Sequence, residues 1–105
     1  MTGTPGGNGA PLNLDPLLHE PARLAVLAAL APADYVEFAA LLHLVGVSKS
    51  SLSKHISALT DAGVVVLTNS PTDKRARRIS LSDTGRESFN IYLQRLEEIV
   101  RMARG

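Results

Sequence analysis

The chain has 105 residues, of which 45% are hydrophobic and 4% aromatic, with a formal net charge of +1 and no cysteine. This composition predicts one globular domain with an aliphatic core, and it excludes disulfides, thiolate metal sites and thiol redox chemistry. No apolar run reaches the ~18 residues of a membrane span, and no signal-peptide pattern opens the sequence. We therefore expect a cytoplasmic protein with no membrane partner.

The first part of the chain predicts a tail followed by two helices. Residues 1–11 are rich in Gly, Thr and Pro and predict a disordered tail, so the domain is expected to span residues 12–105 and to open with a short helix or turn. A first helix is expected from Pro21 to about Ala31, and a second from Tyr35 to Leu44 with Asp34 as its N-cap. Gly46 then suits the tight bend that leads to the next helix.

The third helix is the best defined in the sequence. Ser48 is a strong N-cap candidate, and Leu52, Ile56 and Leu59 follow the i, i+4, i+7 spacing of a buried stripe, with Gly63 at the end. The opposite face is small, polar and weakly cationic: it carries Ser50, Ser53, Lys54, Ser57 and Asp61, flanked by Lys49 and His55. Such a face fits a DNA major groove, and an ordinary solvated surface is the alternative. For His55, packing at the edge of the core and contact with a phosphate are both open.

A basic hairpin is expected after this helix. Residues 64–68 and 76–81 read as two short strands, and residues 69–75 form the connecting tip. Residues 1–47 carry one arginine against four acidic residues, whereas residues 48–80 carry six lysines and arginines against two acidic residues. The positive charge is therefore concentrated on the third helix and the hairpin, which is the pattern expected of a nucleic-acid-binding surface. The cations at or near the hairpin end are Lys74, Arg75, Arg77 and Arg78.

A last helix is predicted from Asp83 to about Arg104, with Ser82 as its cap. Its apolar arc is wider than one packing partner needs, which favours dimerisation over packing within the chain. The candidate dimerisation residues are Phe89, Tyr92, Leu93, Leu96, Ile99 and Val100.

Four motifs together resemble the ArsR/MarR-type winged helix-turn-helix transcriptional regulators. The stretch S-x-x-x-L-S-x-H-I-x-x-L-x-x-A-G-V-V at residues 48–65 is similar to their recognition helix, and Arg23 is similar to an arginine of their first-helix motif. D-K-R at residues 73–75 and L-S-D-T-G-R at residues 81–86 resemble the MarR wing and the start of the helix behind it. The resemblance implies a mainly α fold with a small β-hairpin (α+β): a three-helix core, a two-stranded wing and a C-terminal dimerisation helix, as in the compact, stand-alone members of this group.

The resemblance also implies a function. It implies a homodimer on a pseudo-palindromic double-stranded operator, acting as a repressor, with activation as the alternative. Arg75 matches the wing arginine that enters the minor groove, and Asp73 matches the acidic residue that holds this arginine in place. Residues matching groove and phosphate positions are Ser48, Ser50, Ser51, Ser53, Lys54, His55 and Ser57. A winged-helix module that binds proteins without binding DNA is the competing hypothesis.

The sequence departs from the metal-sensing and ligand-sensing patterns. The cysteine pair of ArsR metal sensors is missing, and the three histidines fall on separate elements, so we expect no metal and no cofactor. One terminal helix leaves little room for a MarR-like small-molecule pocket. The inducing signal stays open between a partner protein, a ligand at the dimer cleft and protein concentration. Catalytic groupings are missing as well, so an enzyme is not expected.

Overall fold

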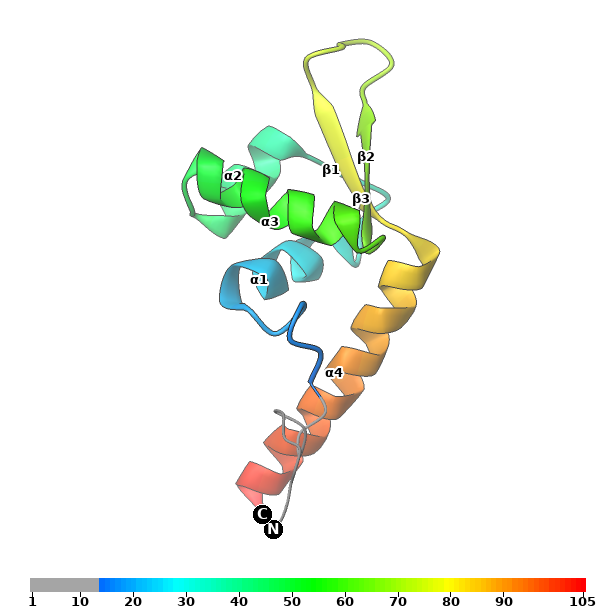
Figure 1. Ribbon diagram of the computed structural model, residues 1–105. Coiled ribbons are helices and arrows are strands. Elements are labelled where there is room, and N and C mark those ends of the chain that lie inside the picture. The colour runs from blue at the N-terminus through cyan, green and yellow to red at the C-terminus, as the bar shows by residue number, and fades with distance from the viewer. Residues whose placement is uncertain (1–13) are drawn as a thin grey trace.

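A computed structural model describes residues 14–105, which form four helices and a three-stranded sheet (Figure 1). The predicted tail at residues 1–11, and the first two residues of the predicted domain, lie outside the described residues. The predicted winged helix-turn-helix architecture is confirmed, with one additional short strand. The elements in chain order are α1 (Pro21–Leu30), β1 (Val36–Glu37), α2 (Phe38–Val45), α3 (Lys49–Asp61), β2 (Val65–Asn69), β3 (Arg77–Leu81) and α4 (Asp83–Arg104).

The sheet is antiparallel, with β3 between β1 and β2. Ile79 of β3 lies opposite Val36 on one side and Leu67 on the other, and its side chain is fully buried. Because successive side chains of a strand point to opposite faces, Arg77 shares the helix-facing side of the sheet with Ile79. Arg78 points to the other side.

The strand β1 is the element that the sequence prediction missed. The second helix was expected from Tyr35 with Asp34 as its cap, but α2 begins at Phe38, and its N-cap Glu37 has extended backbone angles and no side-chain capping bond. Residues 36 and 37 instead pair with β3. Two residues are too few to show strand alternation, so only the tertiary pairing with the wing reveals them.

The core lies between the three short helices, the sheet and the start of α4. The predicted stripe of Leu52, Ile56 and Leu59 on α3 is buried and faces the buried side chains of α1. Phe89 and Tyr92 of α4 complete this core with nearly parallel rings whose centroids are 6.1 Å apart. Each large apolar side chain that is fully buried contributes about 1.5–3 kcal/mol. This packing makes α3 a rigid element whose outer face is free for other contacts.

The start of α4 is fastened to the turn between α3 and β2. Ser82 caps the helix by accepting a hydrogen bond from the Gly85 N–H (2.9 Å), and the Ser82 hydroxyl donates to the carbonyl oxygens of Gly63 and Val64. Gly85 lies so close to this turn that a Cβ placed on it would be 1.9 Å from the Val64 carbonyl oxygen. A residue without a Cβ is therefore required here, and the direction of α4 relative to the core is fixed at its first turn.

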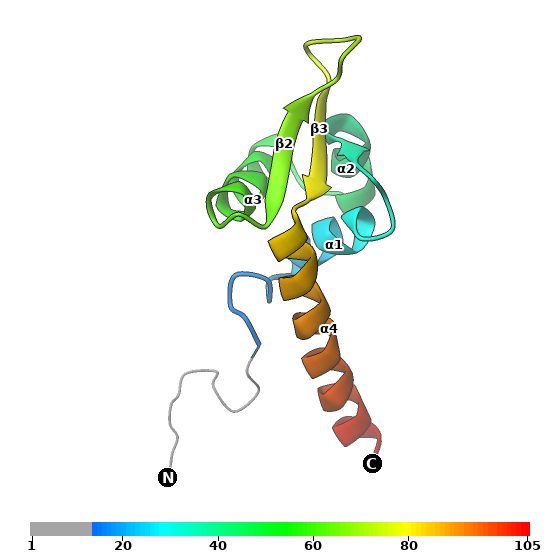
Figure 2. The ribbon, with the colours of Figure 1, turned by 90° about the vertical axis from the view of Figure 1, so that its right-hand side faces the viewer.

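Beyond its first turns, α4 leaves the body of the domain. Figures 1 and 2 show the wing tip and the free end of α4 at opposite ends of a molecule that measures 56 × 26 × 24 Å. The segment before α1 braces the helix: Leu18 is fully buried, and His19 Nδ1 is hydrogen-bonded to the Tyr92 hydroxyl at 2.9 Å. The part of α4 beyond Tyr92 is thus held by the domain on one side only.

Candidate nucleic-acid interface

The N-terminus of α3 is capped as predicted. Ser48 has an extended backbone (φ −68°, ψ 156°), and its Oγ accepts a hydrogen bond from the Ser51 N–H at 3.1 Å. Its hydroxyl is also 3.4 Å from the hydroxyl of Ser50, and both side chains are exposed. The start of α3 therefore presents an ordered pair of hydroxyls to solvent.

The outer face of α3 is exposed and cationic. Ser50, Lys54 and Ser57 follow one another along this face, and Lys49 is exposed beside them, whereas Ser51 and Ser53 are half-buried at its edges. Within residues 14–105, neither lysine forms an ion pair or a hydrogen bond. Two charges and several hydroxyls are thus available to a partner without breaking any contact inside the domain.

His55 is directed toward the interior of the domain. Its Nδ1 accepts a hydrogen bond from Arg23 Nε at 3.1 Å, and its Nε2 lies 3.6 Å from a Glu20 carboxylate oxygen. Only 15% of the side chain is exposed, because it faces α1 across the edge of the core. Both ring nitrogens face partners on or before α1, which favours packing at the core edge, the first of the two alternatives for His55.

Arg23 and Glu20 explain why His55 turns inward. Arg23 also donates to the Leu17 carbonyl oxygen at 3.1 Å, so one guanidinium links the leading segment, α1 and α3. Glu20 caps α1 by accepting a hydrogen bond from the Arg23 N–H, and this bond lowers the pKa of the Glu20 carboxyl. The arginine of the first-helix motif therefore positions α3 and does not itself belong to the outer surface.

The tip of the wing is an ordered loop. The Ser70 N–H donates to the Ala76 carbonyl oxygen at 2.8 Å and closes the loop. At the tip, the Asp73 carboxylate accepts a hydrogen bond from the backbone N–H of Arg75 at 3.0 Å. Asp73 thus holds Arg75 through its backbone, and the exposed side chains of Lys74 and Arg75 remain directed to solvent.

Arg77 and Arg78 do not act as one patch with the tip, because β3 places them on opposite faces of the sheet. The guanidinium of Arg77 lies over the ring of Phe38, 5.6 Å from its centroid, on the side of α3. Arg78 lies over the ring of Tyr35 at 4.1 Å on the other side. Arg78 is half-buried, and its Nε is buried without a hydrogen-bond partner, so only part of this residue is open to DNA. Arg78 is therefore less accessible than the other three predicted cations of the wing.

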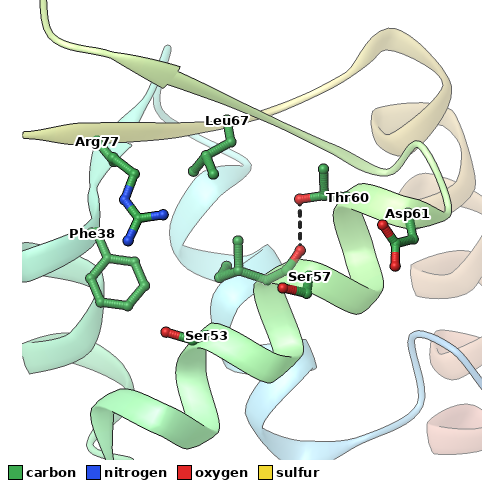
Figure 3. A pocket seen from close by; sticks show the side chains of 8 residues that line it. Phe38, Ser53, Ser57, Thr60, Asp61, Leu67 and Arg77 are labelled. Carbon is green, nitrogen blue, oxygen red and sulfur yellow. Dashed lines mark hydrogen bonds between the residues drawn. The ribbon is translucent and has the colours of Figure 1, made fainter. Parts of the chain in front are cut away.

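A cleft of about 150 Å³ separates α3 from the wing (Figure 3). Arg77 and Phe38 lie at one end, and Thr60 and Asp61 lie at the other. The Thr60 hydroxyl donates to the Ile56 carbonyl oxygen at 2.7 Å and so is not available to a ligand as a donor. The remaining lining residues are Ser53, Ile56, Ser57 and Leu67.

The predicted dimerisation residues divide into two groups. Phe89 and Tyr92 are buried in the core of their own chain, with 3% and 2% exposure, so assigning them to a dimer surface was wrong. The other predicted residues lie further along α4, where Leu93, Leu96 and Ile99 are half-buried and Val100 is exposed. A groove on this part of the helix is lined by Leu93, Leu96, Glu97, Val100, Arg101 and Arg104.

Within residues 14–105, no group of three or more His, Asp or Glu side chains is placed to hold a metal ion. Among the helices described, none is long and apolar enough to cross a membrane.

The family follows from comparison with known proteins. A model of the winged helix DNA-binding domain matches residues 22–100. The chain belongs to this family of DNA-binding domains. This match confirms the winged helix-turn-helix DNA-binding class expected from the sequence. No curated protein matches the sequence.

Solved structures of transcriptional regulators share the fold of this winged helix domain. A regulator homologue from Pyrococcus horikoshii OT3 is 22% identical with a TM-score of 0.78, over 83% of this chain and 87% of that one. PcaV from Streptomyces coelicolor is 21% identical with a TM-score of 0.75, over 85% of this chain and 62% of its own. The repressor CouR, solved on a 23-mer DNA duplex, is 25% identical with a TM-score of 0.71, over 84% of this chain and 58% of its own. The winged helix domain thus spans about three-fifths of PcaV and CouR.

Proposed function

We propose that this protein is a sequence-specific transcriptional repressor that binds a pseudo-palindromic double-stranded operator as a homodimer, with α3 in the major groove. The observation that carries the proposal is the exposed face of α3, with its hydroxyls and two unpaired lysines on a helix fixed by its buried side. A helix with such a face fits a groove about 12 Å wide, and its N-terminal residues reach base edges. The contacts proposed here are Ser48, Lys49, Ser50, Ser51, Ser53, Lys54 and Ser57, with Lys74, Arg75 and Arg77 from the wing.

Arg75 supplies the second contact, in the adjacent minor groove. The Asp73 carboxylate orders the backbone at Arg75, while the guanidinium is exposed at the far end of the hairpin. A narrow minor groove concentrates negative electrostatic potential. A guanidinium held at a protruding tip is therefore attracted most strongly to that groove. Lys74 lies beside it and is proposed to contact the backbone phosphates.

A second copy of the chain is proposed to cover the groove on α4. The groove combines apolar side chains, including Leu96 and Val100, with one acidic residue, Glu97, and two basic residues, Arg101 and Arg104. Two copies related by a twofold axis would place the acidic residue of each near the basic residues of the other. The α4 helices would then set the separation of the two α3 helices, which must be about 34 Å for successive major grooves. Bound there, the dimer would block polymerase, in line with the repressor CouR.

Salt-dependent binding tests the DNA contact. We expect tighter binding to the DNA upstream of the protein's own gene than to a random duplex, with affinity falling steeply with salt for both. Arg75→Ala should weaken binding and reduce the log–log salt slope by about one. Arg75→Lys is the matched control, because it keeps the charge and should keep the slope. An unchanged salt slope in Arg75→Ala would show that Arg75 does not contact the DNA phosphates. If the wild type bound no duplex at low salt, a module that binds proteins would be favoured instead.

Light scattering tests the dimer. Leu96→Glu should give a folded monomer, because two opposed carboxylates in an apolar seam are left unpaired. Leu44→Glu is the matched control, since Leu44 is 65% exposed on α2 and lies outside the groove. A Leu96→Glu protein that stays dimeric would place the dimer contact elsewhere.

A further inference from the structure

Two aromatic side chains beside β1 stack on two consecutive arginines of the wing. Tyr35 precedes the strand and Phe38 follows it, and they meet Arg78 and Arg77 on opposite faces of the sheet. The pairing of β1 with β3 sets this register, since Glu37 lies directly opposite Arg78. The shortest strand of the fold therefore places one aromatic ring under each arginine.

The Arg77–Phe38 pair lies beside the cleft between α3 and the wing, whereas the Arg78–Tyr35 pair lies on the other face of the sheet. Arg77 is exposed at the edge of the cleft between α3 and the wing, at the end that also holds Ser53 (Figure 3). Within the part of the chain that the structure describes, its guanidinium has no carboxylate within ion-pair distance and stacks on the Phe38 ring. This arginine is thus positioned by an aromatic ring while its hydrogen-bond donors remain unused.

The cleft is chemically polarised. Arg77 and the Ser53 hydroxyl lie at one end and the Asp61 carboxylate at the other, with Ser57 between them, and apolar side chains, among them Leu67, line the wall. A guanidinium with a nearby hydroxyl is a donor set for a tetrahedral oxyanion. Asp61 repels an anion from its own end and so confines it to the end near Arg77.

We propose that this cleft receives one backbone phosphate of the DNA, bound by Arg77 and Ser53, and that Phe38 is the residue that positions Arg77 for it. The inference rests on the proposed function, because it places the DNA strand between α3 and the wing. A free arginine loses rotamer freedom when it binds, and stacking on Phe38 in the unbound domain removes part of that cost. Phe38 does not touch the phosphate and acts through Arg77.

A double-mutant cycle tests the positioning role. Phe38→Leu should weaken duplex binding about 2- to 5-fold, which corresponds to the strength of an exposed cation–π contact, without changing the salt slope. Phe38→Tyr keeps the ring and should bind like the wild type. Arg77→Ala should weaken binding further and lower the salt slope by about one, because it removes a phosphate contact. Adding Phe38→Leu to Arg77→Ala should cause no further loss.

The outcomes separate this inference from the proposed function. Equal losses of duplex affinity from Phe38→Leu with and without Arg77 would overturn the positioning role, since Phe38 would then act on binding through the fold alone.

Asp61→Asn should strengthen duplex binding, and weaker binding would contradict the polarity assigned to the cleft. Inorganic phosphate titrated into the free protein should leave the Arg77 side-chain NMR signal unshifted, whereas duplex should shift it. A saturable shift with phosphate alone would make the cleft a site for a free anion. Failure of the wild type to bind any duplex would defeat the proposed function itself.

Discussion

Gly85→Ala is a direct test of the structure, because helix propensity and packing predict opposite changes in the free energy of unfolding. Gly85 lies in the first turn of α4, and glycine is about 1 kcal/mol less favourable than alanine in a helix interior. Propensity alone therefore predicts that the substitution stabilises the domain. The structure instead places the new Cβ 1.9 Å from the Val64 carbonyl oxygen, where approaches under 3.0 Å are essentially never found.

The expected loss can be worked from the bonds at this site. The contact involves backbone on both sides, so α4 must retreat from the turn by about 1 Å or more. That movement disrupts the hydrogen bonds from the Ser82 N–H and hydroxyl to the Val64 carbonyl oxygen (3.0 and 3.1 Å) and from the Thr84 hydroxyl to the Gly63 carbonyl oxygen (3.3 Å). Three bonds at about 1 kcal/mol each, less about 1 kcal/mol of propensity, leave a loss of about 2 kcal/mol. For a domain of this size the melting temperature should fall by about 8–16 °C.

Urea denaturation and calorimetry measure this effect. We expect a lower midpoint at an unchanged m-value for Gly85→Ala. The matched control is Asn90→Ala on the exposed side of the same helix, which should stabilise the domain by a few tenths of a kcal/mol. A Gly85→Ala protein as stable as the wild type would refute the close packing of α4 against the turn after α3.

Three further predictions concern capping and ionisation. Ser48→Ala should lower the free energy of unfolding by about 1 kcal/mol in urea melts, because the Ser51 N–H loses its acceptor; no change would mean that water replaces the cap at no cost. Since a backbone hydrogen bond lowers the pKa of Glu20, its carboxylate stabilises the domain above its unfolded pKa of about 4.3, and this contribution is lost as pH falls through the folded pKa. Glu20→Gln should therefore show a smaller loss of stability on acidification than the wild type, and parallel pH profiles would disprove the linkage. Burial raises the pKa of Tyr92, so stability should be intact below the ordinary tyrosine value of about 10 and should decline above it. Tyr92→Phe should lack that alkaline decline, and a decline of the same size would assign it to other groups.

Local patterns in the sequence were sufficient for most of the fold. The cap at Ser48, the buried stripe on α3, the turn glycine at Gly46 and the extent of α4 all depend on residues close together in the chain. These signals are local because helix periodicity, capping and a backbone with positive φ act within a few residues. The exposed hydroxyls and lysines of α3 followed from the same periodicity.

The remaining features depend on which segments meet in space. The strand β1 exists because β3 pairs with it, and no pattern within two residues could show that. His55 turned inward because Arg23 and Glu20, more than thirty residues away, engage both of its ring nitrogens. The strand alternation of β3 could have separated Arg77 from Arg78, but their aromatic partners follow only from the sheet register.

Tertiary packing also decides which apolar residues of α4 are buried and which are exposed. Its apolar residues form one continuous arc in the sequence, yet the core buries Phe89 and Tyr92 and leaves Val100 exposed. Helix periodicity is a property of the chain alone, so residue spacing was sufficient to predict that α4 is a helix with one wide apolar face. The point along that face where the domain ends depends on tertiary packing, because burial is set by the distance of each turn from the core.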